Sequence, residues 1–248
     1  MNQPEMMTYG ELRGDADVWP GNLDRSSFID SQFQAGMYLD DCAKAGNWDK
    51  VLEILEPGNH LVDINQSRPA TSSRSTVLHR AAEGAAPVDV IEGLLQRGAF
   101  RSLRDRDGLT AFGIATGNAA VSDYVRQLLR PEPSPLDENR IAVLEEILAA
   151  VLDGWIQPLF AGRDLRTVLR YPPVAVLHEA PSHELWVQLP FMAGFRVALR
   201  RGYLDLVMGQ RNTHGVVAEG WVITHRGPVM VYPSEPDSGT RRKEPSGQ

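Results

Sequence analysis

The chain has 248 residues, of which 42% are hydrophobic and 23% charged, and its formal net charge is −7. This length allows one large domain or two ordinary ones with a packed core, and no stretch approaches the roughly 18 consecutive apolar residues of a membrane span. The N-terminus lacks the basic and apolar regions of a signal peptide, and the single cysteine, Cys42, has no intramolecular partner, so we expect a cytoplasmic protein without membrane contact.

The negative charge lies mainly in residues 1–136, which carry 13 basic and 19 acidic groups. No basic face is large enough to predict nucleic-acid binding. An acidic half can attract a basic protein partner over long range, although the same charge can simply keep the protein soluble. The chain has no Gly-rich phosphate loop after a strand and no Gly-x-Ser-x-Gly elbow, and we expect neither a cofactor nor a metal.

The first half of the chain contains a repeated pattern. Residues 1–34 precede it, and we expect them to form part of an N-terminal cap. The segment Thr76-Val-Leu-His-Arg-Ala-Ala then recurs in degraded form as Thr110-Ala-Phe-Gly-Ile-Ala-Thr, 34 residues later. A tandem period in the low thirties is typical of stacked helix–turn–helix units. The repeated part is therefore predicted to be a recognition surface.

Over residues 35–130 this pattern resembles the ankyrin repeat. The middle copy carries the resemblance most clearly, through Thr76, Leu78, His79, Ala81, Ala82, Leu94, Leu95, Gly98 and Ala99. The third copy keeps Asp107, Gly108, Thr110, Phe112 and Ala115, and the first keeps Leu39, Cys42, Ala43, Gly46 and Gly58. No copy has the proline of the family's Thr-Pro-Leu-His turn. The resemblance implies a stack of three repeats, with His79 in a structural role.

The resemblance also implies protein binding through hairpin tips and inner helices. Applied to this chain, it makes candidate partner-binding residues of Lys44, Arg68, Arg74, Glu83, Arg104, Asp105, Arg106 and Asn118. The polar segment 66–75 lengthens the first hairpin loop, and such loops often carry function. We therefore consider two readings of this segment, a partner contact through its two arginines or a disordered excursion.

The second half begins after a Pro-rich linker at residues 131–136. Apolar residues with a period near 3.6 predict a helix from Asp137 to Trp155, and a short helix is expected at 164–169. Short β-rich runs follow at 174–177, 185–189, 195–199, 203–208, 216–223 and 229–232. The predicted fold is thus a three-repeat ankyrin-like helical stack, then an α+β domain at 137–235 with helices on an antiparallel sheet. Residues 236–248 are expected to be a disordered tail.

Ionisable residues in the second half allow an alternative. His178, Glu179, His183 and Glu184 form a His-Glu-x-x-x-His-Glu run, which could serve acid/base or metal chemistry. Its histidines are five residues apart rather than four, and Pro181-Ser182 interrupts the run, so we expect a hairpin turn with diverging side chains. Arg196, Arg200 and Arg201 could likewise form an anion site or only protect a sheet edge with charge.

These observations support two main hypotheses for the function. The first is a protein–protein interaction module, and in a sharper version a bacterial immunity or antitoxin protein that binds and inhibits a partner toxin with a basic domain. The second is an enzyme whose active site lies in residues 137–235, with the repeats recruiting a macromolecular substrate. A third role, in which the α+β domain caps the stack or self-associates, is also open, as is the oligomeric state.

Overall fold

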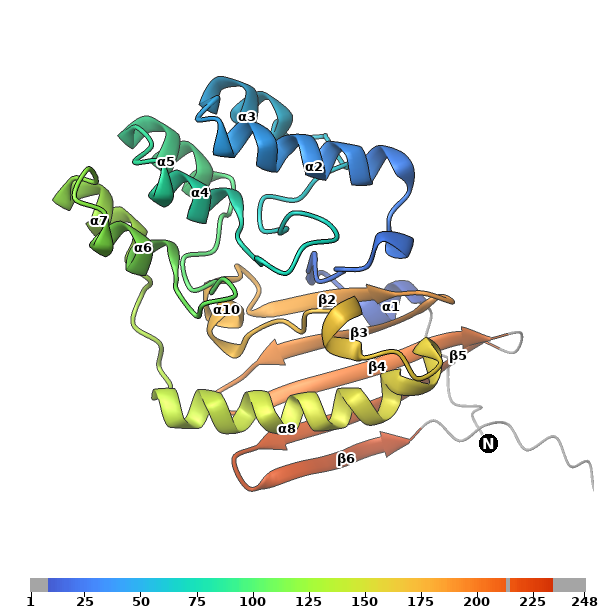
Figure 1. Cartoon of the computed structure of the whole chain (residues 1–248). Helices are drawn as coiled ribbons and strands as arrows, with labels where there is room; N and C mark the ends of the chain where they lie inside the picture. The colour runs from blue at the N-terminus through green and yellow to red at the C-terminus, as the bar shows by residue number, and fades with distance from the viewer. Residues whose placement is uncertain (1–8, 213–214, 234–248) are drawn as a thin grey trace, which may run out of the picture.

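The computed structural model describes residues 9–212 and 215–233. Figure 1 shows short helices from the first half of the chain lying in rows on one side of a sheet that the second half mainly builds. The described residues form an α+β structure, as the sequence predicts. The expected tail at 236–248 lies outside the described residues.

The helices of the first half lie in consecutive pairs. The pairs are α2 (Asp30–Lys44) with α3 (Trp48–Ile54), α4 (Val77–Glu83) with α5 (Val88–Gln96), and α6 (Ala111–Gly117) with α7 (Asp123–Leu129). The first members of the pairs pack side by side in an inner row, and the second members form an outer row (Figure 1). Small buried side chains such as Ala81 and Ala115 allow α4 and α6 to approach closely. Leu39, Ile91 and Leu94 fill the space between the rows.

His79 joins the start of α4 to the loop that follows α5. Its Nδ1 lies 3.2 Å from the backbone nitrogen of Thr76 and accepts that N–H, which caps the helix. Its Nε2 lies 3.1 Å from the carbonyl oxygen of Leu103 and 3.2 Å from that of Leu109. Burial lowers the pKa of this imidazole, so the neutral ring with its proton on Nε2 satisfies all of these groups. The structural role expected for His79 is what the structure shows.

The long loop between α3 and α4 packs beneath the inner row and is not an excursion into solvent. The side-chain amide of Asn65 donates to the carbonyl oxygen of Gly98 at 2.9 Å and accepts the N–H of Phe100 at 2.8 Å. Gly36 of α2 comes so close to the loop that a Cβ there would lie 2.8 Å from the Gln66 side chain and 2.9 Å from Pro69. The loop is therefore part of the packed structure.

The second half contributes most of one sheet. Its strands are β1 (Asp17–Val18), β2 (Glu184–Leu189), β3 (Ala193–Leu199), β4 (Leu204–Asn212), β5 (Gly215–Thr224) and β6 (Gly227–Pro233), and they lie in this order across the described sheet. Neighbours from β2 to β6 are antiparallel, as expected. The sheet is nevertheless mixed, because β1 pairs parallel to β2.

Helices cover one face of this sheet. They are α8 (Glu138–Ile156), the 3-10 helix η2 (Gln157–Phe160), α9 (Leu165–Val168) and α10 (Val174–Glu179). Figure 1 shows α8 running roughly along the direction of the strands, and its buried Leu144, Leu148 and Leu152 share a core with Phe195 of β3. The predicted helices at 137–155 and 164–169 are confirmed.

The strand expected at residues 174–177 is wrong, since these residues begin α10. A short apolar run does not distinguish a buried strand from a buried helix by its pattern. Here Pro173 precedes the helix, and the Glu145 carboxylate accepts the backbone N–H of Val174 at 2.8 Å. A negative charge at a helix N-terminus stabilises the first turn, and this one comes from a distant part of the sequence.

The opposite face of the sheet holds the N-terminal segment. Leu12 of α1 (Tyr9–Arg13) is fully buried there with Trp186, whose ring lies against Gly194: a Cβ at that glycine would be 2.2 Å from the ring. Alternation along β2 turns Trp186 away from the helices and toward this face. Trp19 follows β1, and its ring nitrogen donates to the carbonyl oxygen of Arg170 at 2.7 Å. The described residues 9–18 thus pack on the sheet, and residues 19–22 lie beside the 169–170 segment of the second half.

The β2–β3 turn has an unusual composition. Its residues Phe191 and Met192 have φ values of 60° and 52°, and they are 68% and 50% exposed. Positive φ at both central positions is the pattern of a type I′ hairpin turn, which favours Asn and Gly. Two large apolar side chains are therefore held in solvent at this tip.

Replacing Leu12 with alanine should destabilise the protein by about 2–5 kcal/mol, because it leaves a cavity in the space that the fully buried leucine side chain fills. Chemical denaturation followed by tryptophan fluorescence measures the change. Val18→Ala is the control, since Val18 is 46% exposed and should change stability by less than about 1 kcal/mol. Equal effects of the two substitutions would show that α1 does not pack on the sheet.

Candidate partner-binding surface

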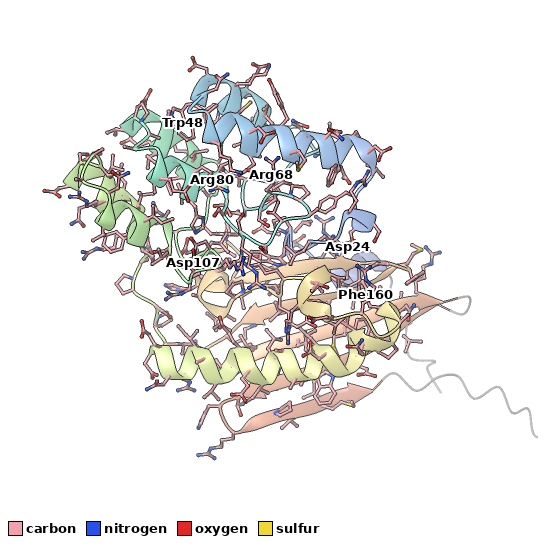
Figure 2. All side chains as sticks on the ribbon, viewed as in Figure 1. Asp24, Trp48, Arg68, Arg80, Asp107 and Phe160 are labelled. Atoms are coloured by element: carbon pink, nitrogen blue, oxygen red, sulfur yellow. The ribbon has the colours of Figure 1, made fainter. Side chains whose placement is uncertain are left out.

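A buried carboxylate organises the inner row of helices. Asp40 lies in the last turn of α2, and its side chain is only 7% exposed. Its oxygens lie 2.8 Å from Lys44 Nζ, 2.9 Å from Arg68 Nη1 and 3.0 Å from Arg80 Nε. The cations come from α2, the long loop and α4, so one side chain joins three segments. Figure 2 shows Arg68 and Arg80 side by side below α2.

Further contacts extend this arrangement to the surface. Arg68 also pairs with Asp41, and Arg80 Nη1 lies 2.8 Å from the Glu83 carboxylate. The side-chain amide of Asn118, at the end of α6, donates to the carbonyl oxygens of Ala82 and Glu83. We call the six charged residues Asp40, Asp41, Lys44, Arg68, Arg80 and Glu83 the Asp40 network. Its charges balance, and it connects consecutive helix pairs.

Opposing effects set the protonation state of Asp40. Burial raises the pKa of its carboxyl group, but hydrogen bonds from Lys44, Arg68 and Arg80 lower it further than burial raises it, so the pKa lies below its ordinary value. The carboxylate is therefore ionised at neutral pH. Removing one partner of such a buried group leaves charges without compensation, which costs more than the pair itself contributes.

The members of the network differ in how far solvent reaches them. The side chains of Arg68 and Arg80 are 16% and 12% exposed, whereas those of Asp41, Lys44 and Glu83 are 59%, 47% and 41% exposed. The arginines thus hold the segments together, and the other three present charge to solvent. Arg68, expected to contact a partner, is instead mainly an internal contact.

The remaining candidates lie in the hairpin loops. Asp105 forms its own turn, because its carboxylate accepts the backbone N–H groups of Asp107 and Leu109, each at 2.9 Å. Arg104 donates to the carbonyl oxygen of Gly108, and Arg106 donates to the hydroxyl of Ser72 at 3.1 Å. Arg74 has a φ of 54°, and the described residues offer its side chain no hydrogen bond or ion pair.

Arg170 from the second half of the chain lies among these loops. Its guanidinium donates to the carbonyl oxygen of Arg104 at 2.6 Å and stands over the Trp19 ring. Burial, reinforced by the positive charge of Arg74, lowers its pKa to about 10. The hairpin tips therefore face the second half of the chain, and Leu103 from one of them is fully buried in the core beneath α8.

The His-Glu-x-x-x-His-Glu run is divided between three environments. Glu179 accepts the backbone N–H groups of Arg101 at 2.6 Å and Ser102 at 2.7 Å, which ties α10 to a loop of the helical rows. Glu184 lies on the sheet, 2.5 Å from Arg200. His178 and His183 come together, with parallel rings whose centroids are 5.9 Å apart. Among the described residues, no three His, Cys, Asp or Glu side chains are grouped as metal ligands.

Sequence reasoning missed Asp40, Arg80 and Arg170 as parts of this surface. One signal for Asp40 was present: an acidic residue stands among the buried positions Leu39, Cys42 and Ala43 of α2. An aspartate is almost never buried unless it is paired. That rule predicts a cationic partner, but the sequence does not say that the partners come from positions 68 and 80.

Comparison with known proteins gives no assignment for this surface. No protein-family model matches the chain, and no curated protein matches it significantly. Within the described residues, no helix combines the length and the apolar character needed to cross a membrane.

Asp63, in the long loop, is the main acid in this region with a raised pKa. Burial raises its pKa to about 6, the nearby carboxylate of Asp17 adds to the rise, and the hydrogen bond from the backbone of Asn65 opposes it. The contact between the loop and the N-terminal segment therefore favours a protonated Asp63. The unfolded chain releases this proton near pH 3.8, so stability falls as the pH rises from about 4 to 6.

Asp40→Asn should destabilise the protein by about 3 kcal/mol at pH 7, because three cations lose the charge that they share. Urea denaturation of both proteins measures the difference. Asp49→Asn serves as the control, since Asp49 is exposed at the start of α3 and should change stability by less than about 0.5 kcal/mol. An Asp40→Asn protein as stable as the parent would show that the network does not hold the helices together.

Asp63→Asn should stabilise the protein by about 1–3 kcal/mol at pH 7.5, and this gain should disappear near pH 4. The amide keeps the oxygen that accepts the Asn65 N–H but carries no charge at any pH. Melting temperatures of the two proteins between pH 4 and pH 8 test this. A gain that stays constant over the range would mean that Asp63 titrates at its ordinary value.

Proposed function

We propose that this chain is a protein-binding module whose helix pairs are three ankyrin repeats. The proposal rests mainly on the inner row of helices. Lys44, Glu83 and Asn118 stand at the ends of α2, α4 and α6, one from each successive pair. Equivalent positions in stacked units form one continuous strip, as a surface for an extended contact requires.

The Asp40 network restricts the exposed side chains of this strip before a partner binds. Because Arg68 and Arg80 fix Asp40 from inside, the exposed Lys44 and Glu83 side chains are already restricted before a partner arrives. Binding then requires less loss of side-chain freedom than it would on an unconnected surface. The exposed charges would govern partner choice and association rate more than affinity.

For the partner we propose a basic protein domain. The charge of residues 1–136, with 19 acidic against 13 basic groups, supports an acidic binding half. In its most specific form, the proposal is that the chain is a cytoplasmic bacterial immunity or antitoxin protein that binds and inhibits a toxin.

We prefer binding to catalysis because the carboxylates of the His-Glu-x-x-x-His-Glu run already have partners. Glu179 holds the backbone of residues 101–102, and Glu184 pairs with Arg200 and, at 3.7 Å, with Arg196. A general acid or base must reach its substrate, and neither carboxylate is placed to do so.

The test is co-expression with the product of the neighbouring gene, followed by measurement of complex formation and of growth. We expect a stable complex and relief of toxicity. Glu83→Lys should weaken the complex at least about tenfold, since it places a cation opposite a basic partner. Glu53→Lys is the matched control, because Glu53 is also an exposed acid in an i,i+3 pair, but on the outer row.

Two results would contradict the proposal. If the neighbouring protein forms no complex, the immunity role is excluded for that pair. If Glu83→Lys and Glu53→Lys weaken the complex equally, only the overall negative charge matters, and the inner row is not the binding surface.

A further inference from the structure

A surface hollow lies apart from the proposed binding strip, where the β3–β4 turn meets α10 and the linker before α8. Its volume is about 740 Å³, and His178, His183, Arg200, Arg201 and Tyr203 line it together with two apolar residues. No carboxylate is part of this lining. The hollow therefore presents hydrogen-bonding groups and positive charge, and its lining contains no anion.

The two histidines are held in position by the backbone around them. His183 follows α10 with a φ of 56°, and its N–H donates to the carbonyl oxygen of Ala180 at 2.9 Å. Its Nδ1 lies 3.2 Å from the carbonyl oxygen of Leu177 and so carries a proton, which leaves Nε2 for a ligand. The ring of His178 stacks on it with an angle of 8° between the planes.

This stacking argues against a metal ion held by both rings. A histidine binds a metal through a lone pair in the plane of its ring, at roughly 2.0–2.1 Å. Lone pairs in two parallel planes do not converge on one point. The pair is better suited to present two polar edges to a larger ligand that spans them.

The charges nearby leave one cation unpaired. Arg200 contacts Glu184 at 2.5 Å and Asp205 at 3.0 Å, so its charge is compensated. Arg201 follows in a tight turn, and its guanidinium has no hydrogen bond or ion pair with any residue that the structure describes. The turn is fixed by Arg140, which donates to the carbonyl oxygen of Gly202 at 2.9 Å.

We propose that this hollow binds a small molecule through its phosphate group. The guanidinium of Arg201 can donate two parallel hydrogen bonds to phosphate oxygens, and the Tyr203 hydroxyl can donate to another, as can Nε2 of His183 when its ring carries a second proton. The volume exceeds the need of one phosphate, so the remaining part of the ligand would lie along Leu199 and Pro135. The neighbouring carboxylates already have partners in the chain, since Glu179 accepts the N–H of Ser102 and Glu184 pairs with Arg200, and neither is part of the lining.

Isothermal titration of the full chain with sodium pyrophosphate, and separately with inorganic phosphate, tests the proposal. Sodium acetate at equal ionic strength is the reference anion. We expect saturable binding of the phosphates with one site per chain and no saturable binding of acetate. Arg201→Gln should weaken pyrophosphate binding by about tenfold or more, as the loss of a charge-assisted bidentate contact predicts. His183→Asn should weaken it as well.

Arg211→Gln is the matched control, because Arg211 is an exposed arginine at the opposite end of β4. It should leave binding unchanged. Since Arg201 is exposed and unbonded, its substitution should not alter the melting temperature, so a loss of binding is not a loss of folding. Absence of saturable phosphate binding, or an equal loss in the Arg201 and Arg211 variants, would overturn the proposal.

Discussion

The arrangement of this protein depends on hydrogen bonds to the backbone N–H and C=O groups of its loops. The loops between helix pairs lie against the sheet half of the chain, where water cannot reach all of their N–H and C=O groups. Three side chains take the place of water: His79 serves Thr76 and the 103–109 loop, Asn65 serves residues 98 and 100, and Glu179 serves residues 101 and 102. An unmet buried group costs about 1–3 kcal/mol, so these bonds hold the loops in shape, and those of Glu179 also join a loop to the second half.

The contact between the helical half and the sheet half determines which surfaces remain open for function. The hairpin tips, which a free helical stack would present, are partly occupied by Arg170 and the core beneath α8. The ends of the inner helices remain open, and the Asp40 network stiffens them. The hollow with the stacked histidines shares no lining residue with the inner-helix ends. A proposed protein partner and a proposed phosphate ligand could therefore bind at once, on surfaces that one carboxylate joins.

Local patterns predicted the local elements, and long-range pairing explains the rest. The Thr76 and Thr110 segments begin helices as their spacing indicates, and α8 follows its apolar period. The pairing of β1 was not predictable, because two residues carry no pattern and the strand exists only beside β2. Similarly, Val174–Leu177 became helical under a carboxylate from α8. Two of the three cations of Asp40 come from positions 28 and 40 residues away, which no motif records.

The β2–β3 turn is less stable than its backbone conformation allows. A turn with two residues at positive φ is most stable with Asn and Gly, whereas here Phe191 and Met192 occupy it and remain exposed. Pairing of β2 with β3 thus holds the hairpin in place, although the residues of its turn are unfavourable for positive φ. For protein engineering, this tip is a place to gain thermal tolerance and solubility without altering the helices or the histidine hollow.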